Sequence, residues 1–282
     1  MQAAAEPASP IPSLAALERL AACDAAPREV LRMRIGLTRL QYEVLGRIRA
    51  EGAVPAIPLN RDSVAFHPIL LERLLVDLVT LLKSMNAGHP QLDRIVANPG
   101  ILAGFSEIAR HAAFEPQSAF LEDAARRLEL PLDTVCWLGR MLAAPFVTAA
   151  VRRVPERGRS SERTSPGCPF CSAPPGLAYL RRADGRRMLV CGLCGEPWCS
   201  IRTACPFCAS AGRWMRLASD EDTVRWVETC DGCHGYLKTI DERQFPEGES
   251  VAPLAESVRT LLLDLAAEKW SCRPNLPYAA MT

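Results

Sequence analysis

Four cysteine pairs constrain the C-terminal half of this chain more than any other feature of its sequence. They are Cys168/Cys171, Cys191/Cys194, Cys205/Cys208 and Cys230/Cys233. Two residues separate the cysteines of each pair, so one tight turn can aim both sulfurs at a single ion. Each pair can therefore supply half of a tetrahedral metal site.

The spacing between the pairs predicts how they combine. Nineteen residues separate the first two pairs, 21 separate the last two, and only 10 separate the middle two. Each long gap contains two strand-like runs, and Asp184-Gly185 is a strong hairpin signal in the first gap. This layout is typical of two tandem zinc-ribbon or rubredoxin-like modules. One would be closed by Cys168, Cys171, Cys191 and Cys194, and the other by Cys205, Cys208, Cys230 and Cys233. Cross-braced pairing, first with third and second with fourth, is the alternative.

The chemistry of the eight cysteines predicts two metal ions per chain. Four thiolates in a tetrahedron suit Zn²⁺ or Fe, so the sequence does not choose between them. Redox dithiols are a competing use, but a thioredoxin-type pair opens a helix, whereas the residues after these pairs are turn-like. A closed four-cysteine site offers no position for a substrate, so we expect these sites to shape a binding surface and predict no enzyme.

The first half of the chain has helical periodicity. From Leu70 to Leu82, leucines recur at intervals of three and four, with charged residues on the other face. Similar patterns cover residues 30–49, 101–114, 117–130 and 133–153, which predicts a bundle of five or six helices. Pro145 should kink or split the last helix, because proline lacks a backbone donor and clashes with the preceding turn.

The pattern changes after residue 151, and this change sets the predicted domains. Residues 152–167 contain five arginines, two prolines and two glycines without an apolar period, which is typical of an exposed linker. Helical spacing returns between Ala255 and Lys269. We therefore predict an α+β chain with an α-helical domain at 1–151, a linker at 152–167, ribbons at 168–200 and 201–245, and a C-terminal helix and tail at 246–282.

Charge and hydropathy limit the partners. The chain has 282 residues and a net charge of +1, which gives no global attraction to nucleic acid. The N-terminus carries Glu6 and Glu18 and lacks the apolar run of a secretory signal, and residues 69–82 are too short and too charged to span a membrane. We expect a cytoplasmic protein without a membrane partner, where twelve cysteines favour metal ligation over disulfides.

Outside the four pairs, few residues point to chemistry. Cys199 could be a nucleophile or sulfur acceptor whose pKa Arg202 lowers, but we favour a residue packed between the ribbons. Cys136 lies on an apolar helix face and is interpreted as core. The histidines at positions 67, 89 and 111 lack metal-ligand spacing, so no catalytic or cofactor-binding residue is predicted. His234 could contact a thiolate or a partner, or serve only as a turn residue.

Four blocks of sequence also carry a family resemblance. The order CPFCSAPP, LVCGLCGEPW, IRTACPFC and VETCDGCHGYLK, within Gly167–Pro277, resembles the formate dehydrogenase accessory (maturation) protein family, FdhE-like. The resemblance implies a non-catalytic cytoplasmic factor that binds the formate dehydrogenase catalytic subunit and is required for its maturation. Homo-oligomerisation stays open.

Two other functions compete with this interpretation. A nucleic-acid-binding zinc ribbon is suggested by nine arginines between Arg152 and Arg187, which face only three acidic residues. The neutral net charge and the acidic residues of the second ribbon disfavour it. A thiol redox or sulfur-transfer factor acting through Cys199 is the third hypothesis.

Overall fold

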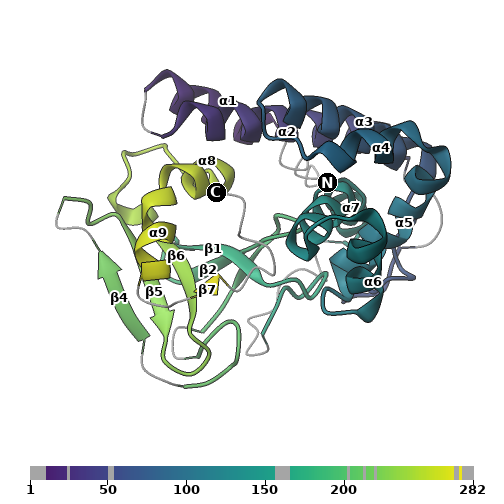
Figure 1. The fold of residues 1–282 in the computed structure, drawn as a ribbon. Helices are drawn as coiled ribbons and strands as arrows, with labels where there is room; N and C mark the ends of the chain where they lie inside the picture. Colours follow the sequence, from purple (N-terminus) through teal and green to yellow (C-terminus); the bar gives the residue numbers. More distant parts are fainter. Residues whose placement is uncertain are drawn as a thin grey trace, which may run out of the picture.

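The computed structural model describes residues 11–23, 26–49, 54–155, 166–201, 204–211, 214–218, 221–269 and 273–274. Helices occupy the N-terminal half of these residues, and a sheet with two further helices occupies the rest (Figure 1). The predicted α+β class is therefore confirmed, with the helices first and the cysteine-bearing strands after them.

Seven helices precede residue 155 in the described part of the chain, where the sequence predicted five or six. They are α1 (Ile11–Ala22), α2 (Arg28–Arg47), α3 (Pro68–Ser84), α4 (Pro90–Ala97), α5 (Pro99–Phe114), α6 (Ala119–Leu128) and α7 (Leu132–Arg152). The eight-residue α4 was missed because its periodic pattern is short. Asn98 separates α4 from α5, and its Oδ1 accepts hydrogen bonds from the N–H groups of Gly100 and Ile101.

Helix α7 is not split by Pro145 and runs without interruption from Leu132 to Arg152. Leu142 and Phe146, on either side of the proline, are fully or almost fully buried. Packing of both halves therefore outweighs the lost backbone hydrogen bond. By length and composition α7 could also cross a membrane, but 67% of its most apolar window is buried within the fold, as in the core helix of a globular protein.

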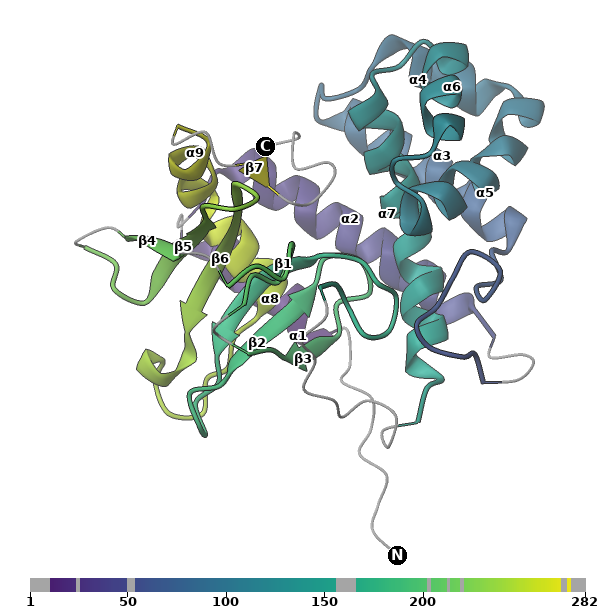
Figure 2. The same ribbon diagram turned by 90° about the horizontal axis from the view of Figure 1, so that it is seen from below.

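A seven-stranded sheet forms the second half of the fold, as counted over the described residues (Figure 2). Its strands are β1 (Pro175–Leu180), β2 (Arg187–Cys191), β3 (Pro197–Cys199), β4 (Trp214–Ala218), β5 (Arg225–Cys230), β6 (Gly235–Asp241) and β7 (Arg273–Pro274). The expected turn at Asp184-Gly185 joins β1 to β2, and Gly185 has a φ of +66°. The sequence also predicts a polar turn at 219–222, between the runs that form β4 and β5, and residues 219–220 of it lie outside the described residues.

The two ribbons share this one sheet. Strands β1, β2 and β3 are antiparallel neighbours, as are β4, β5 and β6, and each set carries one of the predicted modules. A parallel pair joins them, with Ala178 opposite Thr239 and Leu180 opposite Asp241. The strand order is therefore β3-β2-β1-β6-β5-β4, with β7 beside β6.

The expected C-terminal helix consists of two helices, α8 (Pro253–Arg259) and α9 (Leu261–Lys269). The break lies at Thr260, whose hydroxyl donates to the carbonyl of Glu256 at 2.6 Å. Helix α8 packs on α1 through a small cluster that includes Leu17, Leu20 and Val258, and α9 packs on β5 and β6. These helices lie between the sheet and α1 (Figure 1).

The main hydrophobic core extends from the helical half into the first ribbon. It joins Phe105 of α5 and Leu138 of α7 to Phe170, Leu189 and Trp198 of the ribbon. Most of the predicted linker, residues 156–165, lies outside the described residues. The predicted domain boundaries therefore stay a prediction.

Candidate metal centres

The first predicted set of cysteines comes together beside β1 and β2. Cys168 and Cys171 lie on the turn before β1, while Cys191 ends β2 and Cys194 lies on the turn that follows. Their four sulfurs lie within 4.8 Å of one another. Cys168 Sγ is 3.7 Å from Cys194 Sγ, and Cys171 Sγ is 3.4 Å from Cys191 Sγ. All four residues are buried.

The second set comes together beside β4, β5 and β6, also within 4.8 Å. Cys205 Sγ is 3.8 Å from Cys233 Sγ, and Cys208 Sγ is 3.9 Å from Cys230 Sγ. Cys205 and Cys230 are buried, whereas Cys208 is exposed and Cys233 is half-buried. Both sets combine consecutive pairs, so the cross-braced alternative does not occur.

All four pairs use the same local backbone. The residue after the second cysteine has a positive φ each time: +60° at Ser172, +75° at Gly195, +59° at Ala209 and +55° at His234. In three pairs the N–H of this residue donates to the carbonyl of the first cysteine, for example His234 to Cys230 at 2.9 Å. The sequence left three uses of His234 open, and the structure places it at this turn position.

Backbone N–H groups inside the turns point at the sulfurs. Phe170 N lies 3.4 Å from Cys168 Sγ, Leu193 N lies 3.3 Å from Cys191 Sγ, and Phe207 N lies 3.4 Å from Cys205 Sγ. Such donors stabilise the thiolate form that binds a metal. The hydroxyl of Ser210 adds a side-chain partner in the second set, at 3.1 Å from Cys208 Sγ. No motif marked Ser210 in the sequence.

The donor sets fit a tetrahedral metal ion. Four thiols this close cannot all ionise without a cation, and their pKa values spread accordingly. The Ser210 hydrogen bond lowers the pKa of Cys208 to about 6, whereas hydrogen bonding to Cys168 raises the pKa of Cys171 far above its ordinary value. Sulfur-only sets with these separations suit Zn²⁺ or Fe, and either ion would offset the repulsion.

The first set is built against the helical half. The guanidinium of Arg140, a buried residue of α7, donates to the carbonyl of Gly192 between Cys191 and Cys194 at 3.4 Å. The Thr148 hydroxyl donates to the carbonyl of Cys194 at 3.4 Å, and Leu59 N donates to the carbonyl of Phe170 at 2.6 Å. These contacts join segments far apart in sequence, which explains why no local pattern revealed them.

The other cysteines that the structure describes belong to neither set. Cys199 sits on β3 opposite Met188 and is half-buried. This edge-strand position places it in the first ribbon, and Arg202, its proposed activator, lies outside the described residues. Cys136 is fully buried in the main core, as the sequence predicted.

The arginines that suggested nucleic-acid binding are largely engaged within the fold, so far as the structure describes them. Arg181 and Arg186 pair with Asp184. Arg182 donates to the carbonyls of three residues between 245 and 249. Arg187 is buried and pairs with Glu228 at 3.5 Å. A phosphate backbone would have to displace these partners.

Comparisons with known proteins find similarity to FdhE proteins. No family model matches it. It is 28% identical over 216 residues to "Protein FdhE homolog" of Haemophilus ducreyi, covering 75% of this chain and 66% of the relative. It is 35% identical over 103 residues to the homologue of Stutzerimonas stutzeri, covering 35% and 32%. It is 29% identical over 138 residues to Escherichia coli "Protein FdhE", covering 45% and 44%. The chain thus matches less than two thirds of each relative's length.

A solved structure has a similar fold. The crystal structure of the FdhE protein from Pseudomonas aeruginosa matches with a TM-score of 0.52 and 22% identity, over 96% of this chain and 97% of that one. At this identity the likeness shows the fold alone. With the curated relatives it supports an FdhE-like family for this chain, as the four cysteine blocks predicted.

Proposed function

We propose that this FdhE-like chain is a non-catalytic cytoplasmic accessory protein that binds the catalytic subunit of a formate dehydrogenase and is required for its maturation. The observation that carries the proposal is the pair of four-sulfur clusters. Each cluster can fill all four positions of a tetrahedral ion, which leaves none for a substrate. The identity of the partner comes from the family resemblance.

The eight paired cysteines are the proposed ligands of two ions, Zn²⁺ or Fe. When bound, each ion would cross-link two turns of one ribbon. The chain's own residues would hold the thiolates through the backbone N–H groups and Ser210. They would thereby fix the sheet edges and turns that form the surface presented to the partner.

Co-purification tests the partner. The intact chain, tagged and expressed with a formate dehydrogenase catalytic subunit, should retain that subunit on an affinity column, and mass spectrometry should identify it. Formate dehydrogenase activity should fall in cells that lack the chain and return with the wild-type gene. Normal activity without the chain, or no retention of the subunit, would contradict the proposal.

Metal analysis tests the sites separately. Protein purified without oxygen should contain two ions per chain, because eight thiolates close two four-coordinate sites. One ion, or none in a folded protein, would contradict the ligand assignment. Oxygen must be excluded because oxidised thiols cannot ligate.

A further inference from the structure

A groove on the helical half, away from both cysteine clusters, has the chemistry of a binding site. It lies between the C-terminal ends of α2 and α7 and the segment that leads into α3, and its volume is about 940 Å³. Apolar side chains line much of it, among them Leu45, Ile48, Phe66 and Phe146. This size and lining are typical of sites that accept side chains of another molecule.

The charge of this groove is one-sided. Among the residues that the structure describes, four arginines line it, Arg47, Arg49, Arg152 and Arg153, against one acid, Asp62. Arg47 and Arg49 are exposed and form no ion pair with any residue that the structure describes. Asp62 points to solvent with 86% of its side chain exposed, and its nearest cation is Arg61 at 4.0 Å. The groove therefore attracts anionic groups. We call it the arginine groove.

The N-terminus of α3 adds partial positive charge to the same groove. His67 is the N-cap of α3 and its side chain makes no capping hydrogen bond, while Pro68 occupies the first turn. His67, Pro68 and Leu70 all line the arginine groove. The backbone N–H groups in the first turn of this 17-residue helix carry a partial positive charge. The side chain of the N-cap residue accepts no hydrogen bond from them.

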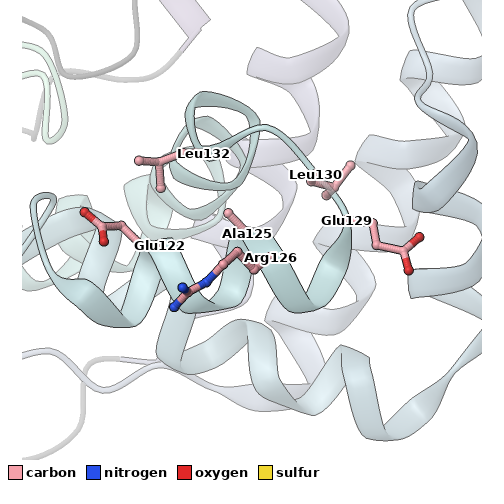
Figure 3. Close-up of a pocket in the computed structure, with 6 residues that line it drawn as sticks. All are labelled: Glu122, Ala125, Arg126, Glu129, Leu130 and Leu132. Atoms are coloured by element: carbon pink, nitrogen blue, oxygen red, sulfur yellow. The ribbon is translucent and has the colours of Figure 1, made fainter.

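A second pocket on the helical half lacks this excess of positive charge. This pocket, about 460 Å³ in volume, lies along α6 and the turn after it. In it, Arg126 lies between Glu122 and Glu129 (Figure 3). Its single cation is thus outnumbered by acids. Arginines near a helix C-terminus complement the helix dipole in both places, but of the two only the arginine groove has more arginines than acids among its described lining residues.

We propose that the arginine groove docks an acidic peptide segment of the partner protein, with one or more apolar side chains on its floor and carboxylates on its rim. A segment of this kind matches both the apolar lining and the exposed Arg47 and Arg49, which form no ion pair with any described residue. This inference rests on the proposed function, because the partner is the formate dehydrogenase catalytic subunit. It adds a contact on the helical half to the ribbon surface of the proposed function.

Charge reversal tests the docking surface. The double variant Arg47→Glu/Arg49→Glu changes two exposed side chains without ion-pair partners among the described residues, so the fold should hold. The matched control is Arg126→Glu/Arg127→Glu, which reverses two exposed arginines in the last turn of α6. We expect the first variant to bind the purified catalytic subunit about tenfold or more weakly at low ionic strength, and the control to bind like wild type.

Salt and hydrogen exchange make the result specific. Added salt should lower the affinity of the wild-type chain for the catalytic subunit, because the contact is electrostatic. The difference in affinity between wild type and Arg47→Glu/Arg49→Glu should therefore become smaller. In the complex, amides at 62–70 should exchange more slowly, while those at 122–132 should not change. Equal binding by wild type and the groove variant would overturn the inference and leave the proposed function intact. Failure of wild type to bind the subunit would overturn both.

Discussion

Three of the four metal-binding turns place a side chain where the backbone favours glycine. Ser172, Ala209 and His234 each have a φ near +60°, and only Gly195 occupies that position without a Cβ. Such positions cost on the order of 1 kcal/mol each for ordinary residues. The strain persists because the turn must aim two sulfurs and their N–H donors at one point. The backbone N–H of His234 takes part in this geometry through its hydrogen bond to the carbonyl of Cys230.

Substitution of single cysteines can distinguish a structural role of the metal sites from a reactive role of Cys199. Cys230→Ser leaves three sulfurs in the second set, and part of a metal-linked folding energy of about 10 to 16 kcal/mol should be lost, by analogy with small zinc domains. Metal content, protease resistance and partner binding should therefore fall together. Cys199→Ser lies outside both sets and should leave all three near wild type.

The same pair of variants can contradict the accessory-protein proposal. A redox or sulfur-transfer factor acting through Cys199 requires normal metal content and partner binding in Cys199→Ser, with loss of formate dehydrogenase activity in cells. That result would make Cys199 the reacting residue. The ribbons would then serve to position Cys199 for its reaction.

At the scale of elements, the sequence predicts what local patterns encode. The Asp184-Gly185 signal located the hairpin of β1 and β2, and the CxxC spacing grouped the eight cysteines as the structure does. Strand β3 has only three residues, and β7 has two, so neither carries a readable alternation. The parallel pairing of β1 with β6 joins residues about sixty positions apart, and nothing local specifies it.

Close helix packing is another feature without a local signal. A Cβ added to Gly139 of α7 would lie 2.6 Å from Ala112 Cβ and 2.9 Å from the carbonyl oxygen of Ile108, both on α5. The two helices approach this closely only because residue 139 has no side chain. Gly139 was part of a recognised helical pattern, but its identity as a contact point depends on the tertiary fold.

Gly139→Ala should therefore destabilise the protein, by about 1 to 3 kcal/mol, because α5 and α7 must separate to admit the methyl group. Gly104→Ala in α5 is the matched control, since a Cβ there meets nothing within 4 Å. It should stabilise by about 0.5 to 1 kcal/mol through helix propensity. Denaturant unfolding of both variants measures the difference. Equal effects would mean that α5 and α7 tolerate a wider separation.

At the scale of the whole molecule, the two cysteine sets occupy different environments. The first set belongs to the main core, which continues through Phe170, Leu189 and Trp198 into α5 and α7. Arg140 and Thr148 tie its second turn to α7. The second set lies in the other half of the sheet, with Cys208 exposed, and none of its four cysteines belongs to the main core cluster.

This difference predicts unequal consequences of metal loss. Cys171→Ser opens a site inside the main core, so the helical half and the first ribbon should lose stability together, seen as a lower midpoint of global unfolding and faster hydrogen exchange in α7. Cys208→Ser opens a site at the surface, so faster exchange should be confined to β4, β5 and the turns around them.

A chelator added to wild type should remove one ion early and the other late, because solvent reaches Cys208 but not the first set. Release of both ions at one rate, or equal loss of α7 protection in the two variants, would show that the shared sheet couples the two sites into one cooperative unit.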